Sequence, residues 1–330
     1  VSDELADLGI RALRSSKGAV SADMTTRQLY AANVFLRCAT RILVRVAGFT
    51  VRTFADLERR IAEVEWDYWI GAGDSPRFRV TSRNSELWHD GAVAQRFETA
   101  LGSPVPGARE QLVVVRAVND RFTVSVDSSG APLHERGWRQ AIAKAPLRES
   151  VAAGLLVAAG WDRTTPLVDP MCGSGTIAIE AALIAAGVAP AAGRELAFRF
   201  WPGFEPGTWA SVAAEIQNLR SEAGDPPRIV SVDRYAGAVD SARANAERAG
   251  VADLIEWRTA PIAELEPPDG PGGRPGLLVA NPPWGGRLDG GDMRNLYATL
   301  GRVASEGFGG WSLGVLVADR TLARQVRPGL

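Results

Sequence analysis

Residues 168–176, Val-Asp-Pro-Met-Cys-Gly-Ser-Gly-Thr, constrain the fold more than any other part of this sequence. The segment joins a short apolar run ending in an acid to a glycine-rich turn, and an apolar helical pattern begins at Thr176. Glycine at positions 173 and 175 permits a sharp turn and lets a ligand approach the backbone without meeting a Cβ. The segment therefore predicts the strand, turn and helix of a doubly wound α/β fold, with a nucleotide-type cofactor at the turn.

The acid at the strand tip narrows the kind of ligand. A carboxylate at Asp169, facing the start of a helix, suits a cationic or hydroxyl-bearing group better than a phosphate. The sequence G-x-x-x-x-G-K-[ST] is absent, which argues against a phosphate-cradling NTPase loop. A tight turn with a purely structural role is the alternative at this point.

Composition sets wide bounds. The chain has 330 residues, of which 46% are hydrophobic, enough for two or three domains with real cores. No apolar run reaches the roughly 18 residues of a membrane span, and no signal-peptide pattern is present. The two cysteines, Cys38 and Cys172, lie far apart, so neither a disulfide framework nor a cysteine zinc site is expected. We expect a cytoplasmic protein with no membrane association and no metal, and its oligomeric state is left open.

Charge is unevenly distributed between the two halves. Residues 1–150 carry 21 Lys and Arg against 18 Asp and Glu, whereas residues 151–330 carry 16 against 20. The basic residues are arginines except Lys17 and Lys144, so bidentate phosphate contacts are available. This asymmetry favours an anionic partner on the N-terminal half, with a bias in genomic base composition as the plainer explanation.

The hydrophobic pattern divides the chain into two regions. In the first, we expect strands at 18–22, 40–47, 77–83, 112–118 and 121–127, helices at 25–36, 90–101 and from 53, and a hairpin turn at 119–120. A connector at 133–145 leads to a helix that ends at 159. From 165 onward, strands at 166–169, 229–233, 254–257, 277–280 and 312–319 alternate with helices at 176–186, 236–249 and 295–305, which predicts a parallel sheet.

Three strand tips carry polar chemistry. Asp169 ends the first strand, and Asp233 ends the second, where a carboxylate accepts the hydroxyls of a ribose. An NAD-dependent dehydrogenase would show the same pair of acids. The third tip is Asn281-Pro282-Pro283-Trp284, whose two prolines form a rigid elbow that directs the Asn side chain and backbone carbonyls out of the sheet.

The Asn-Pro-Pro-aromatic motif after an Asp-Pro-x-x-Gly-x-Gly turn resembles the S-adenosylmethionine-dependent amino methyltransferases. The resemblance implies that an exocyclic amine donates hydrogen bonds to the Asn281 side chain and the Pro282 carbonyl, while Trp284 stacks on the base. Pro283 completes this catalytic set. The cofactor is expected at Asp169, Met171, Cys172, Gly173, Ser174, Gly175, Thr176, Asp233, Arg234 and Ala260. The motif alone leaves guanine N2, adenine N6 and cytosine N4 open.

The N-terminal half carries a second resemblance. Residues 79–97 resemble the THUMP RNA-binding domain, and residues 125–149 and 194–204 are similar to segments of bacterial RNA guanine-N2 methyltransferases. Together these imply an α/β fold with a Rossmann-like class I methyltransferase domain, preceded by α+β ferredoxin-like and THUMP RNA-binding domains. The expected domains are 1–52 (with strands near 112–127), 53–111, a connector at 128–150, and 151–330. RNA contacts are expected at Arg77, Arg79, Ser82, Arg83, His89, Arg136, Arg139 and Lys144, with a merely solvated face as the alternative for the strand arginines.

The resulting hypothesis is methylation of guanine N2 in structured RNA, with 23S ribosomal RNA favoured. A tRNA guanine-N2 methyltransferase and a catalytically silent RNA-binding or assembly protein are the alternatives. The family commonly has Tyr where Trp284 stands, and it often has an acid after the third strand, where this chain has Thr259-Ala260-Pro261. We also expect the first strand of the N-terminal subdomain and the closing strands after Asp319 to be absent, so that both ends are incomplete.

Overall fold

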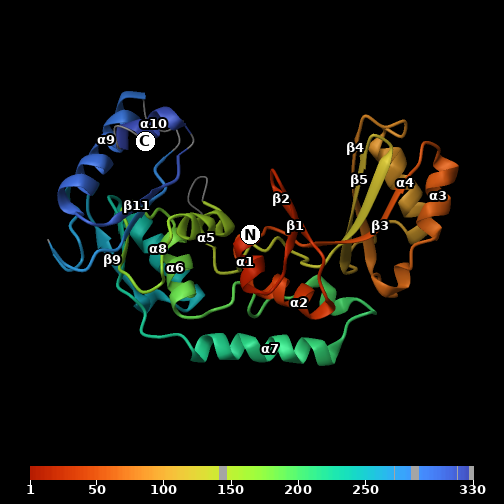
Figure 1. Cartoon of the computed structure of the whole chain (residues 1–330), viewed down its shortest axis with the longest axis horizontal. Coiled ribbons are helices and arrows are strands. Elements are labelled where there is room, and N and C mark those ends of the chain that lie inside the picture. The colour runs from red at the N-terminus through yellow and green to blue at the C-terminus, as the bar shows by residue number, and fades with distance from the viewer. Residues whose placement is uncertain (141–146, 271, 284–289, 318, 327–330) are drawn as a thin grey trace. The chain divides into compact units, whose positions relative to one another are not determined.

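The computed structural model describes residues 1–140, 147–270, 272–283, 290–317 and 319–326. Contacts between residues divide the chain into two compact units. The N-terminal unit comprises Val1–Leu133 and Gly193–Val212, and the C-terminal unit comprises His134–Ala192 and Ala213–Leu330. Figure 1 shows the elements of each unit, which are described separately below.

The N-terminal unit contains a two-stranded sheet and a four-stranded sheet. Its elements are α1 (Ser2–Asp7), β1 (Ala12–Ser16), β2 (Ala19–Ala22), α2 (Thr26–Phe35), β3 (Leu43–Thr50), α3 (Phe54–Ala62), β4 (Ser75–Arg83), α4 (Asp90–Leu101), β5 (Glu110–Val118) and β6 (Arg121–Asp127). Strands β1 and β2 pair with each other, and the larger sheet has the order β3-β6-β5-β4. The expected elements are present, and β1 is an additional strand.

The four-stranded sheet buries one face against a helix. Phe122 and Val124 are fully buried on this side, and the rings of Phe78 and Phe97 lie 5.6 Å apart where α4 packs on β4. The hairpin between β5 and β6 turns at Asn119 and Asp120, whose φ angles are +51° and +63°. Two successive left-handed residues are typical of a type I′ turn, so the predicted hairpin is confirmed.

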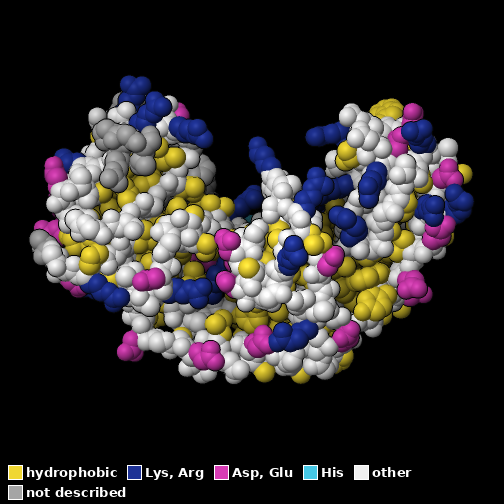
Figure 2. Space-filling view, in the orientation of Figure 1, with side chains coloured by type: hydrophobic (Ala, Val, Ile, Leu, Met, Phe, Trp, Pro, Cys, Tyr) yellow, Lys and Arg dark blue, Asp and Glu magenta, His cyan; other side chains and the backbone are white. Residues whose placement is uncertain are grey.

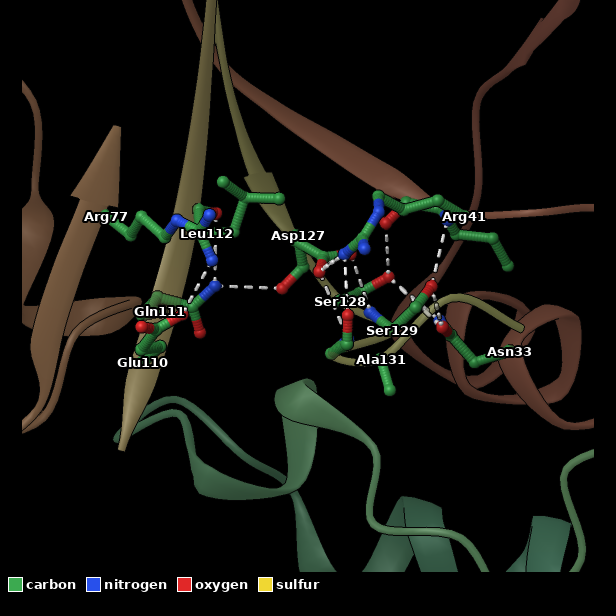
Figure 3. A network of polar contacts seen from close by, with 12 residues as sticks. Asn33, Arg41, Arg77, Glu110, Gln111, Leu112, Asp127, Ser128, Ser129 and Ala131 are labelled. Atoms are coloured by element: carbon green, nitrogen blue, oxygen red, sulfur yellow. Dashed lines mark hydrogen bonds and ion pairs between the residues drawn. The ribbon is translucent and has the colours of Figure 1, made fainter. Parts of the chain in front are cut away.

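A buried polar network lies where β6 ends (Figure 3). Asp127 pairs with Arg41 and accepts a hydrogen bond from the Ser129 N–H at 3.0 Å. The Ser129 hydroxyl donates to Asn33 at 3.0 Å, and the Gln111 amide donates to the Asp127 carbonyl at 2.9 Å. Burial raises the pKa of Asp127, which the Arg41 charge opposes. The network fixes α2 and the start of β5 to the end of β6.

The C-terminal unit is built on a five-stranded parallel sheet with the order β11-β10-β7-β8-β9. The strands are β7 (Leu167–Asp169), β8 (Ile229–Asp233), β9 (Ile255–Thr259), β10 (Leu277–Ala280) and β11 (Ser312–Val315). The helices are α5 (Glu149–Ala158), α6 (Thr176–Ala185), α8 (Ala236–Ala249), α9 (Gly290–Gly307) and α10 (Arg320–Val326), and α7 (Pro206–Ser221) begins in the N-terminal unit.

Alternating residues of these strands point into two separate cores. Leu167, Ile229 and Leu277 pack with residues of α5, α6 and α8. Val168 and Val230 pack on the other face with residues of α9 and α10. A parallel sheet covered by helices on both faces confirms the predicted doubly wound fold. In the described part of the chain, no helix is long and apolar enough to cross a membrane.

Candidate functional site

The polar strand tips meet at one edge of the parallel sheet. Asp169 ends β7, Asp233 ends the neighbouring strand β8, and Asn281 follows β10 on the other side of β7. The chain runs outward from β7 through β8 to β9, and then returns to β10 on the opposite side. Ligands of doubly wound sheets bind outside the carboxyl ends of the strands at such a reversal. The fold therefore brings all three predicted tips to the expected binding edge.

Hydrogen bonds attach the glycine turn to β8. The Cys172 N–H donates to the Val232 carbonyl at 2.9 Å, and the Gly173 N–H donates to Asp233 Oδ2 at 3.0 Å. Both glycines have left-handed backbones, with φ of +53° at Gly173 and +79° at Gly175. The second acid of the site thus orients the turn that follows the first.

Asp169 is buried with an unused acceptor. Its residue is 1% exposed, and Oδ1 accepts a long hydrogen bond of 3.3 Å from the Met171 N–H. Oδ2 has no hydrogen-bond partner among the described residues. Burial, aided by the nearby negative charge of Asp233, raises the pKa of Asp169 to about 7. A buried carboxyl that lacks a donor is the kind of group that a cationic ligand completes.

Asn281 repeats this pattern on the adjacent strand. Its side-chain oxygen Oδ1 is buried and has no hydrogen-bond partner among the described residues. Pro282 is buried behind it, and the last residue of β10 accepts a hydrogen bond from the Leu316 N–H at 3.0 Å. Two neighbouring strands therefore each end in a buried acceptor without a donor. Trp284 lies outside the described residues.

The remaining predicted cofactor residues surround the turn. Ser174 and Thr176 are buried, and their hydroxyls are 3.3 Å apart. Burial raises the pKa of the Cys172 thiol, which favours the neutral form and argues against a nucleophilic role. The Ala260 N–H donates to the Asp233 carbonyl at 3.1 Å, and Arg234 is exposed with its guanidinium over the Tyr235 ring.

Two arginines predicted to contact RNA are instead internal. The Arg136 side chain is 2% exposed and pairs with Glu180 of α6 at 3.3 Å. Arg139 pairs with Glu149 at 3.0 Å and also donates to the Thr176 hydroxyl at 3.0 Å. Because these guanidiniums are committed to buried carboxylates, both positions are corrected from RNA contacts to supports of the glycine turn.

Asn245 is a supporting residue that the sequence interpretation missed. It is fully buried on α8, its Nδ2 donates to the Ser174 carbonyl at 3.1 Å, and its Oδ1 accepts from the Gln140 N–H at 3.3 Å. Val239, Ala242 and Ala246 are buried on the same helix. A lone amide among apolar positions of one helical face was the available signal.

The other predicted RNA contacts lie in the N-terminal unit. Arg77, Arg79 and Arg83 are exposed at alternate positions of β4. Ser82 points to the opposite side and donates its hydroxyl to the Leu87 carbonyl at 2.7 Å, so it fixes a loop. His89 caps α4 by accepting the Ala92 N–H at Nδ1. Lys144 lies outside the described residues.

Comparison with known families gives two matches. Residues 136–328 match a family model described as an RMKL-like methyltransferase domain. Residues 1–43 match a model described as an RlmL ferredoxin-like domain. The match confirms the expected ferredoxin-like segment.

Curated and solved proteins are similar along nearly the whole chain. The chain is 33% identical to Ribosomal RNA large subunit methyltransferase K/L of Chromohalobacter salexigens, covering 98% of this chain and 47% of the relative, so it spans about half the length of the curated relatives it matches. SMU.472, solved in complex with SAH, gives a TM-score of 0.86 at 26% identity and covers 98% of this chain and 88% of that chain. A protein described as a predicted N6-adenine-specific DNA methylase from Listeria monocytogenes gives a TM-score of 0.86 at 30% identity, covering 99% and 87%.

Proposed function

This chain belongs to the RMKL-like methyltransferase family, and from that membership we propose that it methylates the exocyclic N2 amine of a guanine in structured RNA. S-adenosylmethionine is the proposed methyl donor and 23S ribosomal RNA the favoured substrate, in the cytoplasm. The observation that carries the proposal is the pair of buried acceptors without donors, Asp169 Oδ2 and Asn281 Oδ1, at the tips of neighbouring strands.

The residues of the turn fit the proposed cofactor. The unpartnered Asp169 oxygen would accept hydrogen bonds from the ammonium of its methionine part. Each oxygen of Asp233 already accepts one backbone N–H, from Gly173 and Tyr235, and a carboxylate retains further lone pairs for ribose hydroxyls. When bound, S-adenosylmethionine supplies an electrophilic methyl group on a sulfonium.

The tip of β10 would hold the amine. Asn281 Oδ1 and the Pro282 carbonyl accept its two N–H groups and aim the nitrogen lone pair at the methyl group. The amine nitrogen becomes more positive as its bond to the methyl carbon forms, so fixed acceptors stabilise the developing charge. The extra proton is then lost to solvent, and a strong general base is not required. We place Pro283 in the rigid elbow and Trp284 against the face of the base.

The names of the relatives support RNA and leave one rival. The Chromohalobacter relative is named for large-subunit ribosomal RNA. The Listeria relative is described as an N6-adenine-specific DNA methylase, and an Asn-Pro-Pro tip also fits an adenine amine. We favour guanine N2 because the N-terminal segments resemble those of RNA guanine-N2 methyltransferases, and a tRNA substrate is the nearest alternative within this class.

A labelling experiment tests the proposal. The full chain is incubated with labelled S-adenosylmethionine and unmodified total RNA, the RNA is fractionated, and the nucleosides are separated. We expect label in N2-methylguanosine of large-subunit ribosomal RNA. Label in the tRNA fraction would select the tRNA alternative, and label in N6-methyladenosine, or in DNA only, would refute the proposal.

Calorimetry separates the proposal from a silent RNA-binding or assembly protein. S-adenosylhomocysteine serves as the titrant because it carries the same ammonium and ribose. We expect binding to the parent chain and greatly reduced binding to Asp169→Ala. Absence of binding by the parent chain, with RNA binding retained, would favour the silent protein.

A further inference from the structure

One face of the four-stranded sheet carries six exposed arginines. They alternate with buried residues along the strands and lie opposite the face that packs on α4. We call this set the arginine face, and its members are Arg45, Arg77, Arg79, Arg83, Arg116 and Arg121. Figure 2 shows dark blue side chains gathered over the part of the molecule where β3, β4 and β5 lie in Figure 1.

Strand register places these arginines in adjacent rows. In one row, Arg79 is opposite Val114 on β5, and Arg45 is opposite Ser125 on β6, which itself pairs with Val114. Arg83 and Arg121 both lie opposite Val118, in a row at the end of the sheet. Neighbouring strands are about 4.8 Å apart, and residues two apart on a strand are about 7 Å apart. The guanidiniums therefore form a grid with spacings close to those along a nucleic-acid backbone.

The charge of this face is not neutralised within the described chain. Of the six arginines, only Arg77 has an ion pair there, with Glu110 at 3.1 Å. Exposed arginines elsewhere in the same unit do have carboxylate partners, at Arg52, Arg59, Arg60, Arg96 and Arg109. Like charges close together on a sheet are destabilising, so the contrast points to an external anion.

An exposed tryptophan lies at one end of this face. Trp88 is 73% exposed, in the loop between β4 and α4. The loop is anchored by Leu87, which is buried, and by the Glu86 N–H, which donates to Asp120 at 2.8 Å. Asp120 belongs to the hairpin turn next to Arg121, so the loop is fastened at the sheet end that carries Arg83 and Arg121. A solvated indole on an anchored loop is a stacking surface for an unpaired base.

We propose that the arginine face and Trp88 bind a single-stranded segment of the RNA substrate. Arg45, Arg79, Arg83, Arg116 and Arg121 contact phosphates, and one base stacks on Trp88. A base inside a duplex has no free face for an indole, which is why an unpaired segment is the favoured occupant. This inference rests on the proposed function for its choice of RNA as the polyanion, and it assigns contacts to four residues, Arg45, Trp88, Arg116 and Arg121, that the sequence interpretation did not select.

Anisotropy of a labelled 15-nucleotide single-stranded RNA, titrated with the full chain over a range of salt concentrations, tests the proposal. The triple variant Arg45→Gln/Arg116→Gln/Arg121→Gln removes three charges from the face. Arg52→Gln/Arg59→Gln/Arg60→Gln removes the same charge from ion-paired positions and serves as the matched control. We expect the face variant to lose affinity at least 30-fold and its slope against log salt to fall by about 2, since each phosphate contact contributes about 0.7. The control should stay within about threefold of the parent.

Trp88 is tested by substitution and rescue. Trp88→Ala should lower affinity about tenfold without changing the salt slope, and Trp88→Phe should recover most of the loss. Thermal melts verify that the variants fold. Equal affinities of the face variant and its control, or tighter binding of a hairpin duplex than of the single strand, would overturn the inference.

The methyl-labelling assay separates this inference from the proposed function. If the parent chain labels guanine N2 and the face variant binds and labels RNA equally well, the proposed function stands and the arginine face is not the contact. If RNA binds through the face and no methyl is transferred, the inference stands and the proposed function falls.

Discussion

The Arg139 guanidinium donates a hydrogen bond of 3.0 Å to the hydroxyl of Thr176, the first residue of α6. Arg139 also donates to Glu149 Oε1 at 3.0 Å and to the Leu147 carbonyl at 2.7 Å. Glu149 is 4% exposed, and burial raises its pKa. One buried cation therefore joins the segment before α5, the start of α5 and the end of the glycine turn.

Removing that cation should be costly. Arg139→Gln leaves Glu149 buried without its charge partner, which typically destabilises a protein by about 3–5 kcal/mol. Arg302→Gln is the matched control, because its ion pair with Glu306 is exposed on both sides and such pairs contribute at most about 1 kcal/mol. Urea unfolding measures both changes. The double variant Arg139→Gln/Glu149→Gln should recover part of the loss, and a cost equal to that of the control would contradict this account.

The two glycines of the turn should differ in their tolerance of alanine. A Cβ at Gly175 would lie 2.8 Å from the Ala242 Cβ, whereas a Cβ at Gly173 would have nothing within 4 Å. Both positions have positive φ, so alanine at either costs about 1–2 kcal/mol. Gly175→Ala should cost about 1–3 kcal/mol more, since α6 and α8 must separate. Free energies of unfolding in urea decide the matter, and equal costs would show that the close helix contact is unimportant.

Local patterns in the sequence were sufficient to locate the site. The apolar strands that end in Asp169, Asp233 and Asn281 set both the secondary structure and the edge at which the side chains meet, because parallel strands share one carboxyl end. The Asn119-Asp120 turn was likewise predictable, since those residues tolerate the left-handed backbone that the hairpin requires.

Charge in the sequence did not reveal burial. Arg136 and Arg139 looked like surface cations because their partners, Glu180 and Glu149, come from helices that a local pattern cannot place beside them. The acid at Glu180, within the apolar run of α6, was the one available sign of a buried ion pair. Strand register was equally inaccessible, so Arg45, Arg116 and Arg121 could not be grouped with Arg79 before the pairing was known.

Asp169 should make ligand binding depend on pH. Its pKa, about 7 in the ligand-free fold against 3.8 normally, means that the acid is protonated at low pH and must ionise to pair with an ammonium. S-adenosylhomocysteine affinity should therefore rise about tenfold per pH unit up to pH 7 and level off above pH 8. Calorimetry in buffers of different ionisation enthalpy should detect a released proton below pH 7. Asp169→Asn should bind weakly and without this pH dependence.

The same carboxyl should affect the stability of the ligand-free chain in the opposite sense. A raised pKa in the folded state means that the fold binds the proton more tightly than the unfolded chain does. This contribution is complete below about pH 4 and is lost as pH rises through 7. Asp169→Asn, which does not titrate, should therefore gain in melting temperature relative to the parent between pH 5 and 8. A constant difference across this range would show that the buried carboxyl does not titrate there.

Asn281 should act on methyl transfer and leave cofactor binding intact. Its buried Oδ1 has no donor in the described part of the chain, and in the proposed reaction it accepts an N–H of the amine as positive charge develops. Loss of one such fixed dipole typically slows the chemical step about 10²–10³-fold. Asn281→Ala should show that loss in single-turnover rates with RNA, while its affinity for S-adenosylhomocysteine stays within about threefold of the parent. Asn281→Asp, which keeps an acceptor at the same position, should lose less. Parallel losses in cofactor affinity and rate would instead assign Asn281 to the shape of the cofactor site, and an unchanged rate would remove it from the reaction.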